Sequence, residues 1–126
     1  ALSLRDFARF GQMLIDARGA GGRSQIPGWF IETLNASSGK RKAKASEIDG
    51  LTRGTELRYG FVHLGGAANR IALIGPYGNS LYLDFDRRLV VALFASYPKE
   101  YSPSLLATLE QLWEAVGSAT QPAKKR

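Results

Sequence analysis

Residues 3–18 carry apolar side chains at the spacing of an amphipathic helix. The positions that share one side of this helix are Leu4, Phe7, Phe10, Leu14 and Ile15. Ser3 and Asp6 stand where the side chains of an N-terminal cap belong. The glycine-rich residues 19–22 readily take a positive φ, so we expect the helix to end there.

Two further helices are predicted, one short and one long. Pro27 suits a first helical turn, and the residues after it give the short helix an apolar side, formed by Trp29, Phe30, Ile31 and Leu34. The long helix is expected from about Ser102 to Val116, and its apolar side comprises Leu105, Leu109, Leu112, Trp113 and Val116. We interpret Trp29 and Trp113 as anchors of the core.

Aromatic and β-branched residues are concentrated in three runs that predict strands, residues 56–64, residues 70–75 leading into 80–85, and residues 89–96. The polar residues 84–88 form a break of hairpin length, so the strands beside it should pair antiparallel. Turn chemistry explains Asp84 and Asp86 in this break better than a pair of catalytic carboxylates does. The last run is apolar on both faces, and we expect it to be central or covered by helices on both sides.

These elements predict an α+β fold, with an antiparallel sheet of three to four strands, N-terminal helices and a C-terminal covering helix. A chain of 126 residues with 44% hydrophobic content can build one core but hardly two. We therefore expect a single domain over residues 1–120. Residues 37–54 have little hydrophobic periodicity and are interpreted as a basic loop, and residues 121–126 as a flexible basic tail.

The net charge of +6 comes largely from this loop and this tail, which we interpret as solvated segments. The alternative is a basic interaction module in which Lys40, Arg41, Lys42 and Lys44 bind nucleic acid or an acidic partner. Nucleic acid is the less favoured partner, because no aromatic residues for base stacking are interleaved with these cations. The absence of cysteine and the presence of one histidine, His63, argue against a metal site, and no cofactor is expected. We interpret His63 as structural.

The segment IALIGPYGNSLYLDFDRRLVVALFASYP, with SLRDFARFGQML and YGFVHL upstream, resembles the C-terminal third of serine hydrolases of the penicillin-binding-protein and β-lactamase type. Among these hydrolases, the segment is most similar to class C-like esterases and 6-aminohexanoate-dimer hydrolases. The likeness covers most of residues 3–116, apart from the basic loop. It implies a partial β-lactamase or transpeptidase-like fold, a bacterial source and an ester or amide substrate for the complete protein.

Enzymes of this family activate a serine hydroxyl with a lysine one helical turn away, in a Ser-x-x-Lys motif on a buried helix. A Tyr-x-Asn element normally accompanies it, and both precede the region that is resembled here. Ser37 and Lys40 match the first motif, but charged residues follow them where a buried helix would be apolar. Tyr77 and Asn79 match the second motif, although at the wrong place in the chain.

The resemblance places one wall of the substrate cleft at Gly75, Pro76, Tyr77, Gly78 and Asn79. Two positions depart from the family pattern, because Leu73 replaces a lysine or histidine and Pro76 replaces a residue whose N–H serves the oxyanion hole. A missing donor of this kind costs about 3 kcal/mol of transition-state stabilisation.

We therefore expect this chain to form part of a serine hydrolase without carrying its nucleophile, with Ser37 and Lys40 as the less favoured catalytic pair. The expected partner is an N-terminal half of the fold that supplies the nucleophile, or a second copy of the chain. No targeting signal or membrane span is recognised in residues 1–126, so the expected compartment stays open between bacterial cytoplasm and periplasm.

Overall fold

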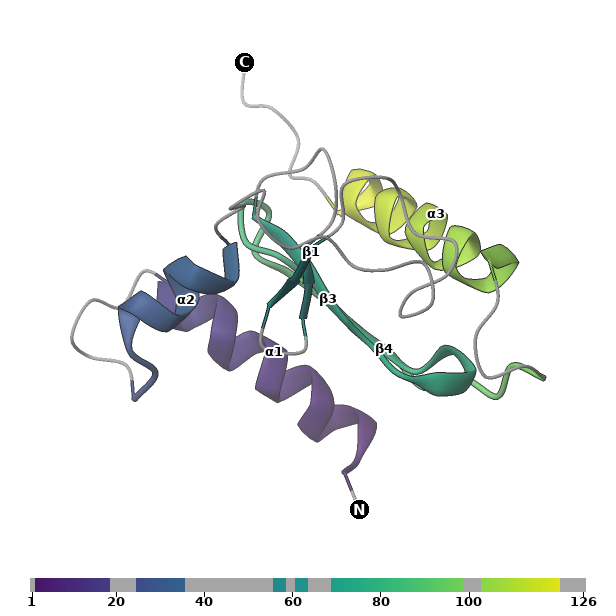
Figure 1. Cartoon of the computed structure of the whole chain (residues 1–126), viewed down its shortest axis with the longest axis horizontal. Coiled ribbons are helices and arrows are strands. Elements are labelled where there is room, and N and C mark those ends of the chain that lie inside the picture. Colours follow the sequence, from purple (N-terminus) through teal and green to yellow (C-terminus); the bar gives the residue numbers. More distant parts are fainter. Residues whose placement is uncertain are drawn as a thin grey trace.

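An antiparallel sheet lies between two helical layers in the computed structural model of the chain (Figure 1). The structure describes residues 2–18, 25–35, 56–58, 61–63, 69–98 and 103–120. The helices within these ranges are α1 (Leu4–Arg18), α2 (Gly28–Asn35), the short 3₁₀ helix η2 (Pro76–Gly78) and α3 (Pro103–Ala119). The strands are β1 (Glu56–Arg58), β2 (Phe61–His63), β3 (Arg70–Ile74), β4 (Ser80–Asp84) and β5 (Leu89–Leu93). The predicted α+β class is confirmed.

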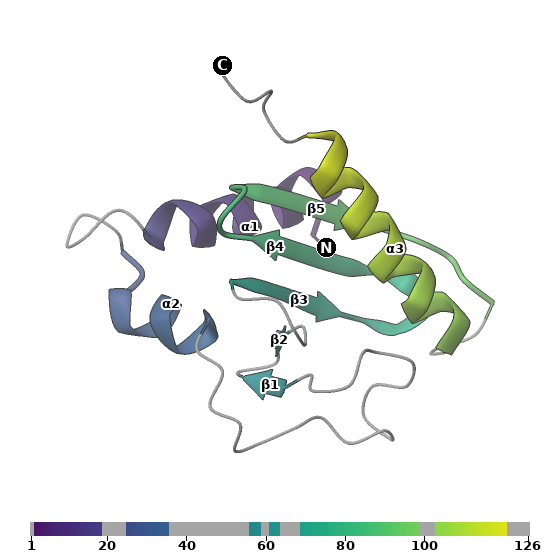
Figure 2. The same cartoon turned by 90° about the horizontal axis from the view of Figure 1, so that it is seen from above.

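The strands follow one another across the sheet in the order β1-β2-β3-β4-β5, and every neighbouring pair is antiparallel (Figure 2). The described sheet thus has five strands where the sequence predicted three to four. The additional strand arises because the run 56–64 forms two strands that pair with each other. The expected hairpin between β4 and β5 is present, with Asp84 opposite Leu89.

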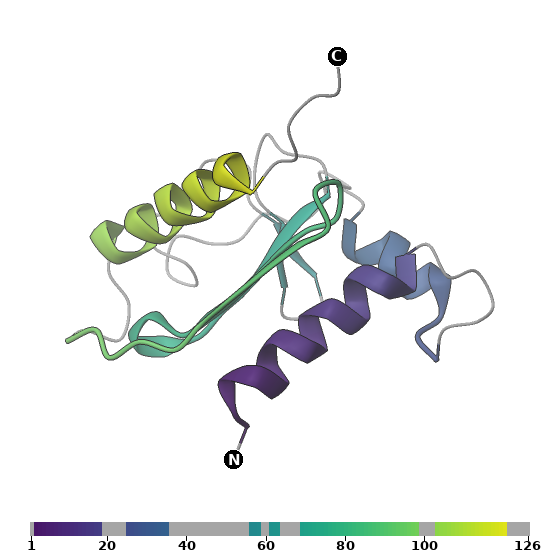
Figure 3. The same ribbon diagram turned by 180° about the vertical axis from the view of Figure 1, so that it is seen from behind.

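Helices cover both faces of the sheet, as the edge-on view shows (Figure 3). Helices α1 and α2 pack on one face, where Leu14, Ile15, Leu81 and Leu83 belong to the core. Helix α3 packs on the other face and buries Trp113 and other apolar residues against alternate side chains of the same strands. The core is therefore divided into two halves by the sheet, and strand β4 is buried along its whole length.

The predicted cap of α1 is confirmed by two hydrogen bonds. The Asp6 N–H donates to Ser3 Oγ at 3.1 Å, and the Ser3 hydroxyl donates to the Asp6 carboxylate at 2.8 Å. These bonds satisfy an N–H that the first turn leaves without a helical partner. Helix α3 extends to Ala119, beyond the expected end near Val116.

One of the expectations about burial needs correction. Trp113 is buried as predicted, but 62% of Trp29 is exposed, so Trp29 is not a core anchor. In α2, Ile31 and Leu34 face the core instead, because a helix of eight residues has one narrow inward side. Helices cover both faces of β5, which is one of the two arrangements expected for this strand, and β5 is the last strand of the described sheet.

Candidate functional site

The link between β3 and β4, residues 75–79, contains all five residues that were expected to line a cleft; we call it the β3–β4 turn. The Gly75 N–H donates to the Asn79 carbonyl oxygen at 2.8 Å, and the Asn79 N–H donates to the Pro76 carbonyl oxygen at 3.4 Å. These bonds close the turn across its base. The five residues therefore form one compact unit at an end of the sheet.

Tyr77 at the tip of this turn has a backbone conformation that tyrosine rarely adopts, with φ 60° and ψ 21°. Gly78 follows with φ 93°, and a Cβ at Gly78 would lie 3.0 Å from the Cβ of Ala95. The residue after Tyr77 is therefore restricted to glycine by both conformation and space. The Tyr77 side chain remains 47% exposed. Backbone strain of this kind is found preferentially at functional sites.

Hydrogen bonds also tie the turn to the segment that follows β5. The Ala95 N–H donates to Asn79 Oδ1 at 3.0 Å, and the Tyr97 N–H donates to the Tyr77 carbonyl oxygen at 3.0 Å. Leu105 of α3 lies next to Gly78. The turn is thus held by two neighbouring segments, the one after β5 and α3, and the backbone that carries the exposed Tyr77 side chain is fixed.

Two backbone positions of the turn, Gly75 and Pro76, offer no donor to an anionic oxygen. Pro76 has no N–H, and the N–H of Gly75 is already used within the turn. Leu73, at the position where the resemblance implies a polar residue, packs against the apolar core on the α1 side of the sheet. The turn therefore contributes a fixed backbone and the exposed aromatic side chain of Tyr77.

The second group of expected residues cannot be placed. Ser37 and Lys40 lie outside the described residues, as do the basic loop 37–54 and the tail 121–126. The backbone of His63 belongs to β2, but its side chain is outside the described part of the structure.

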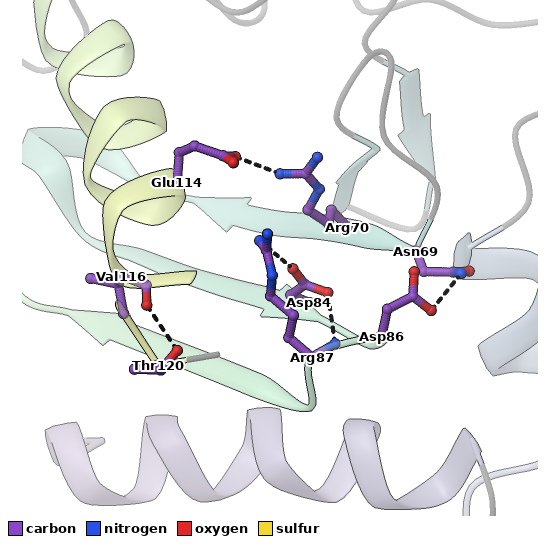
Figure 4. A network of polar contacts seen from close by, with 8 residues as sticks. All are labelled: Asn69, Arg70, Asp84, Asp86, Arg87, Glu114, Val116 and Thr120. Carbon is purple, nitrogen blue, oxygen red and sulfur yellow. Dashed lines mark hydrogen bonds and ion pairs between the residues drawn. The ribbon is translucent and has the colours of Figure 1, made fainter. Parts of the chain in front are cut away.

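A network of charged side chains on the α3 face of the sheet was not anticipated from the sequence (Figure 4). Asp84 is only 3% exposed and accepts hydrogen bonds from the Arg87 N–H at 3.1 Å and from Arg87 Nη1 at 3.3 Å. Arg70 Nη1 donates to Glu114 of α3 at 2.7 Å. A signal was available, since Ser80, Tyr82 and Asp84 alternate along β4 and therefore share one face.

The pKa values of two groups in this region respond to the packing of α3 on the sheet. Burial raises the pKa of the Tyr82 phenol, and the nearby Arg70 guanidinium offsets part of that increase. Burial is the largest single influence on the pKa of Arg70 and acts to lower it, but the interactions with Glu114 and Tyr82 together outweigh burial, and the pKa is raised. The network therefore favours a neutral phenol and a charged guanidinium, which suits structural roles.

Of the two acidic residues in the β4–β5 hairpin, Asp84 acts in the way that turn chemistry predicts. Asp84 binds the N–H of Arg87, three residues ahead. Asp86 is exposed, accepts a hydrogen bond from Asn69 Nδ2 at 3.0 Å, and lies 3.5 Å from Arg18 Nη1. The two carboxylates therefore stabilise the hairpin and its contacts with α1 and β3.

In the part of the chain that the structure describes, no cluster of three or more histidine, cysteine or acidic side chains could hold a metal ion. The described helices also include none that is long and apolar enough to cross a lipid bilayer. No protein-family model matches the chain, and a comparison with curated proteins finds no relative.

Proposed function

We propose that this chain is the C-terminal part of a serine hydrolase fold and supplies one wall of a cleft for esters or amides. The β3–β4 turn forms that wall, and the nucleophile belongs to another segment. The observation that carries the proposal is the exposed Tyr77, held in a strained conformation on a turn that two neighbouring segments, the one after β5 and α3, hold in place.

Support also comes from the order of the elements. The resemblance implies an early helix, a strand, a glycine-containing turn and an apolar hairpin, and the described elements occur in this order along the chain. A rigid turn at the end of a sheet is a suitable place for binding residues, because the scaffold holds them in position without further ordering.

The chemistry of the turn favours a role in binding. With Pro76 lacking an N–H and the Gly75 N–H occupied, neither backbone group can stabilise a tetrahedral oxyanion. Tyr77 offers a flat aromatic surface and a hydroxyl that can donate or accept a hydrogen bond. We therefore expect this wall to position the substrate, with charge stabilisation supplied from elsewhere.

Binding can be tested without turnover by titrating the isotopically labelled chain with p-nitroacetanilide, a stable amide analogue of p-nitrophenyl acetate. We expect amide shifts concentrated at Tyr77 and Gly78, and their loss in Tyr77→Ala. Trp29→Ala is the matched control, because it removes another exposed aromatic side chain from a distant helix. Equal effects of the two substitutions would show that the turn does not bind the ligand specifically.

The location of the nucleophile has a separate test. We expect the chain to hydrolyse p-nitrophenyl acetate no faster than buffer does, and to form no covalent adduct with a fluorophosphonate probe. An adduct at Ser37, together with activity that disappears in Ser37→Ala, would place the nucleophile in this chain.

The basic-module alternative predicts a different result. An oligonucleotide or an acidic peptide would bind with a steep salt dependence. Neutralising Lys40, Arg41, Lys42 and Lys44 would abolish that binding, and the p-nitroacetanilide shifts at Tyr77 would be missing.

A further inference from the structure

Charge is distributed unevenly along strands β3, β4 and β5. The charged residues of these strands and of the β4–β5 hairpin lie together at one end of the sheet, and each forms an ion pair; they are Arg70, Asp84, Asp86, Arg87 and Arg88. Residues 71–83 and 89–98, which include the β3–β4 turn at the other end, contain no acidic or basic residue. We call this uncharged end the turn end of the sheet.

Aromatic side chains remain exposed at the turn end. Tyr77 at the tip of the turn is 47% exposed, and Phe94, directly after β5, is 45% exposed. The residue after Phe94 is Ala95, whose N–H binds Asn79 of the turn. The two exposed rings therefore belong to segments that a hydrogen bond joins at this end. Exposed apolar side chains that lie together are typical of ligand-binding surfaces.

The first half of helix α1 extends this apolar surface. The rings of Phe7 and Phe94 lie stacked, with their centroids 5.7 Å apart and their planes inclined by 28°. Leu4 and Phe10 are 46% and 37% exposed, and each lies three residues from Phe7, so they are its neighbours on the helix surface. Figures 1 and 3 show the beginning of α1 toward the same end of the molecule as the link between β3 and β4.

The described cations near this surface are directed away from it or held at a distance. Arg5 and Arg9 each lie two residues from Phe7, and residues two apart on a helix do not share a side. Asp6 belongs to the N-terminal cap of the helix. Arg58 belongs to β1, which β2 separates from β3, so its backbone lies about 10 Å from β3.

A charged ligand would gain little on such a surface. An ion loses part of its hydration beside apolar side chains, and only an opposite charge or a set of hydrogen bonds compensates for that loss. The N–H groups of Gly75 and Ala95 are already used, and Pro76 has none. An uncharged aromatic group needs no such partner and can pack against the rings of Tyr77 and Phe94.

From these features we propose that the turn end binds an uncharged ester or amide whose aromatic group packs against Tyr77 and Phe94. The inference rests on the proposed function, because it names the class of substrate for the same wall. Substrates that carry a charge on this group are disfavoured, since no described side chain is placed to compensate for it.

Three ligands of nearly identical shape test the role of charge. At neutral pH, p-nitroacetanilide is uncharged, 4-acetamidobenzoate is an anion and 4-acetamidobenzamidine is a cation. Each is titrated into the isotopically labelled full chain, and the amides of Tyr77 and Ala95 report the dissociation constant. We expect the constant of p-nitroacetanilide to be at least about tenfold lower than the other two.

The outcomes of this titration separate the two proposals. A charged ligand that binds through the same amides as tightly as p-nitroacetanilide would overturn the inference and leave the proposed function standing. An absence of shifts at Tyr77 with all three ligands would overturn both.

The contribution of the second ring has its own test. Phe94→Ala should raise the dissociation constant of p-nitroacetanilide at least about threefold, because one of the two rings is removed. Trp29→Ala removes an exposed ring from α2 and should leave the constant unchanged. Circular dichroism checks that both variants fold, and an unchanged constant in folded Phe94→Ala would contradict the inference.

A cation added to the turn end should improve the binding of the anion. Ser96 is exposed and lies between Ala95 and Tyr97, whose N–H groups bind the turn. Ser96→Arg should therefore lower the dissociation constant of 4-acetamidobenzoate at least about threefold and change that of p-nitroacetanilide by less than about twofold. Gln111→Arg adds the same charge at an exposed position of α3 and should change neither. Equal gains in the two variants, or no gain in Ser96→Arg, would show that a missing local cation is not what disfavours the anion, and would overturn the inference.

Discussion

The rings of Tyr82 and Trp113 lie stacked, with their centroids 5.0 Å apart and their planes inclined by 6°. Tyr82 belongs to β4 and Trp113 to α3, so this contact fastens the C-terminal helix to the centre of the sheet. The Tyr82 hydroxyl and the Trp113 Nε1 have no hydrogen-bond partner among the described residues. The stabilisation therefore comes from buried aromatic surface and dispersion.

Two substitutions of Trp113 should show separately how much its ring and its N–H contribute to the free energy of unfolding. Trp113→Ala should lower the free energy of unfolding by about 3–5 kcal/mol, because it opens a large cavity beneath α3. Trp113→Phe keeps an aromatic ring and removes the unpartnered N–H, so the expected loss is smaller, about 1–2 kcal/mol. Urea denaturation measures both values, and equal losses would contradict this account.

Stability should decrease in alkaline solution partly through Tyr82. Because burial raises the pKa of this phenol in the folded state, the unfolded chain releases the proton first as the pH rises. The contribution of the Tyr82 phenol to the free energy of unfolding is fully present below the ordinary tyrosine pKa of about 10. It is lost as the pH rises through the higher pKa of the folded state. Tyr82→Phe should show a shallower loss of unfolding free energy as the pH rises above about 10. Identical slopes for the variant and the parent chain would rule out this contribution.

Two glycines provide a matched test of the packing between α1 and the sheet. A Cβ at Gly11 would lie 2.7 Å from Val90 Cγ1, and the β-branched Val90 cannot easily turn away. Alanine improves helix propensity by about 1 kcal/mol, but the overlap should outweigh this and leave Gly11→Ala about 1–2 kcal/mol less stable. Gly28→Ala has open space around the new Cβ, so its melting temperature should be unchanged or higher.

The buried carboxylate of Asp84 should be more important than its exposed neighbour Asp86. Asp84→Ala should lower the free energy of unfolding by about 2–3 kcal/mol, because the Arg87 N–H and guanidinium lose their acceptor. Asp84→Asn keeps an acceptor for the N–H and should lose about 1 kcal/mol. Asp86→Ala serves as the control in the same denaturation experiment, and an equal loss there would show that burial does not determine the effect.

Local patterns in the sequence were sufficient to predict most of the helices and strands. The apolar spacing of residues 3–18 and the pair Ser3 and Asp6 define α1 and its cap, since both signals depend on neighbours within one helical turn. The polar break before Leu89 likewise predicts the β4–β5 hairpin. Such features require no knowledge of distant parts of the chain.

Features that depend on distant partners were predicted less well. Periodicity identifies an apolar side of α2, but it does not show how much of that side packs against the sheet. Trp29 belongs to the part that stays exposed. Apolar residues on both faces of β5 indicate helical layers, yet they do not show that the strand is at an edge.

The candidate site shows the same difference between local features and features that depend on distant partners. The break between the strand-forming runs 70–75 and 80–85 placed the β3–β4 turn correctly, because this signal is local. The strained backbone of Tyr77 and the bond from Ala95 to Asn79 depend on the segment after β5, which the local sequence does not specify. The contact between Arg70 and Glu114 beneath α3 was missed for a similar reason, since the two residues are far apart in the chain.

The consecutive order of the five strands has a consequence for how the chain folds. Each strand pairs only with strands adjacent to it in the sequence, so the sheet can grow by successive short loop closures with a low entropic cost. The slow step is then the docking of α1 onto β5, which joins segments about seventy residues apart. Substitutions at the contact between α1 and β5 should therefore change the folding rate more than substitutions within the β3–β4 hairpin do.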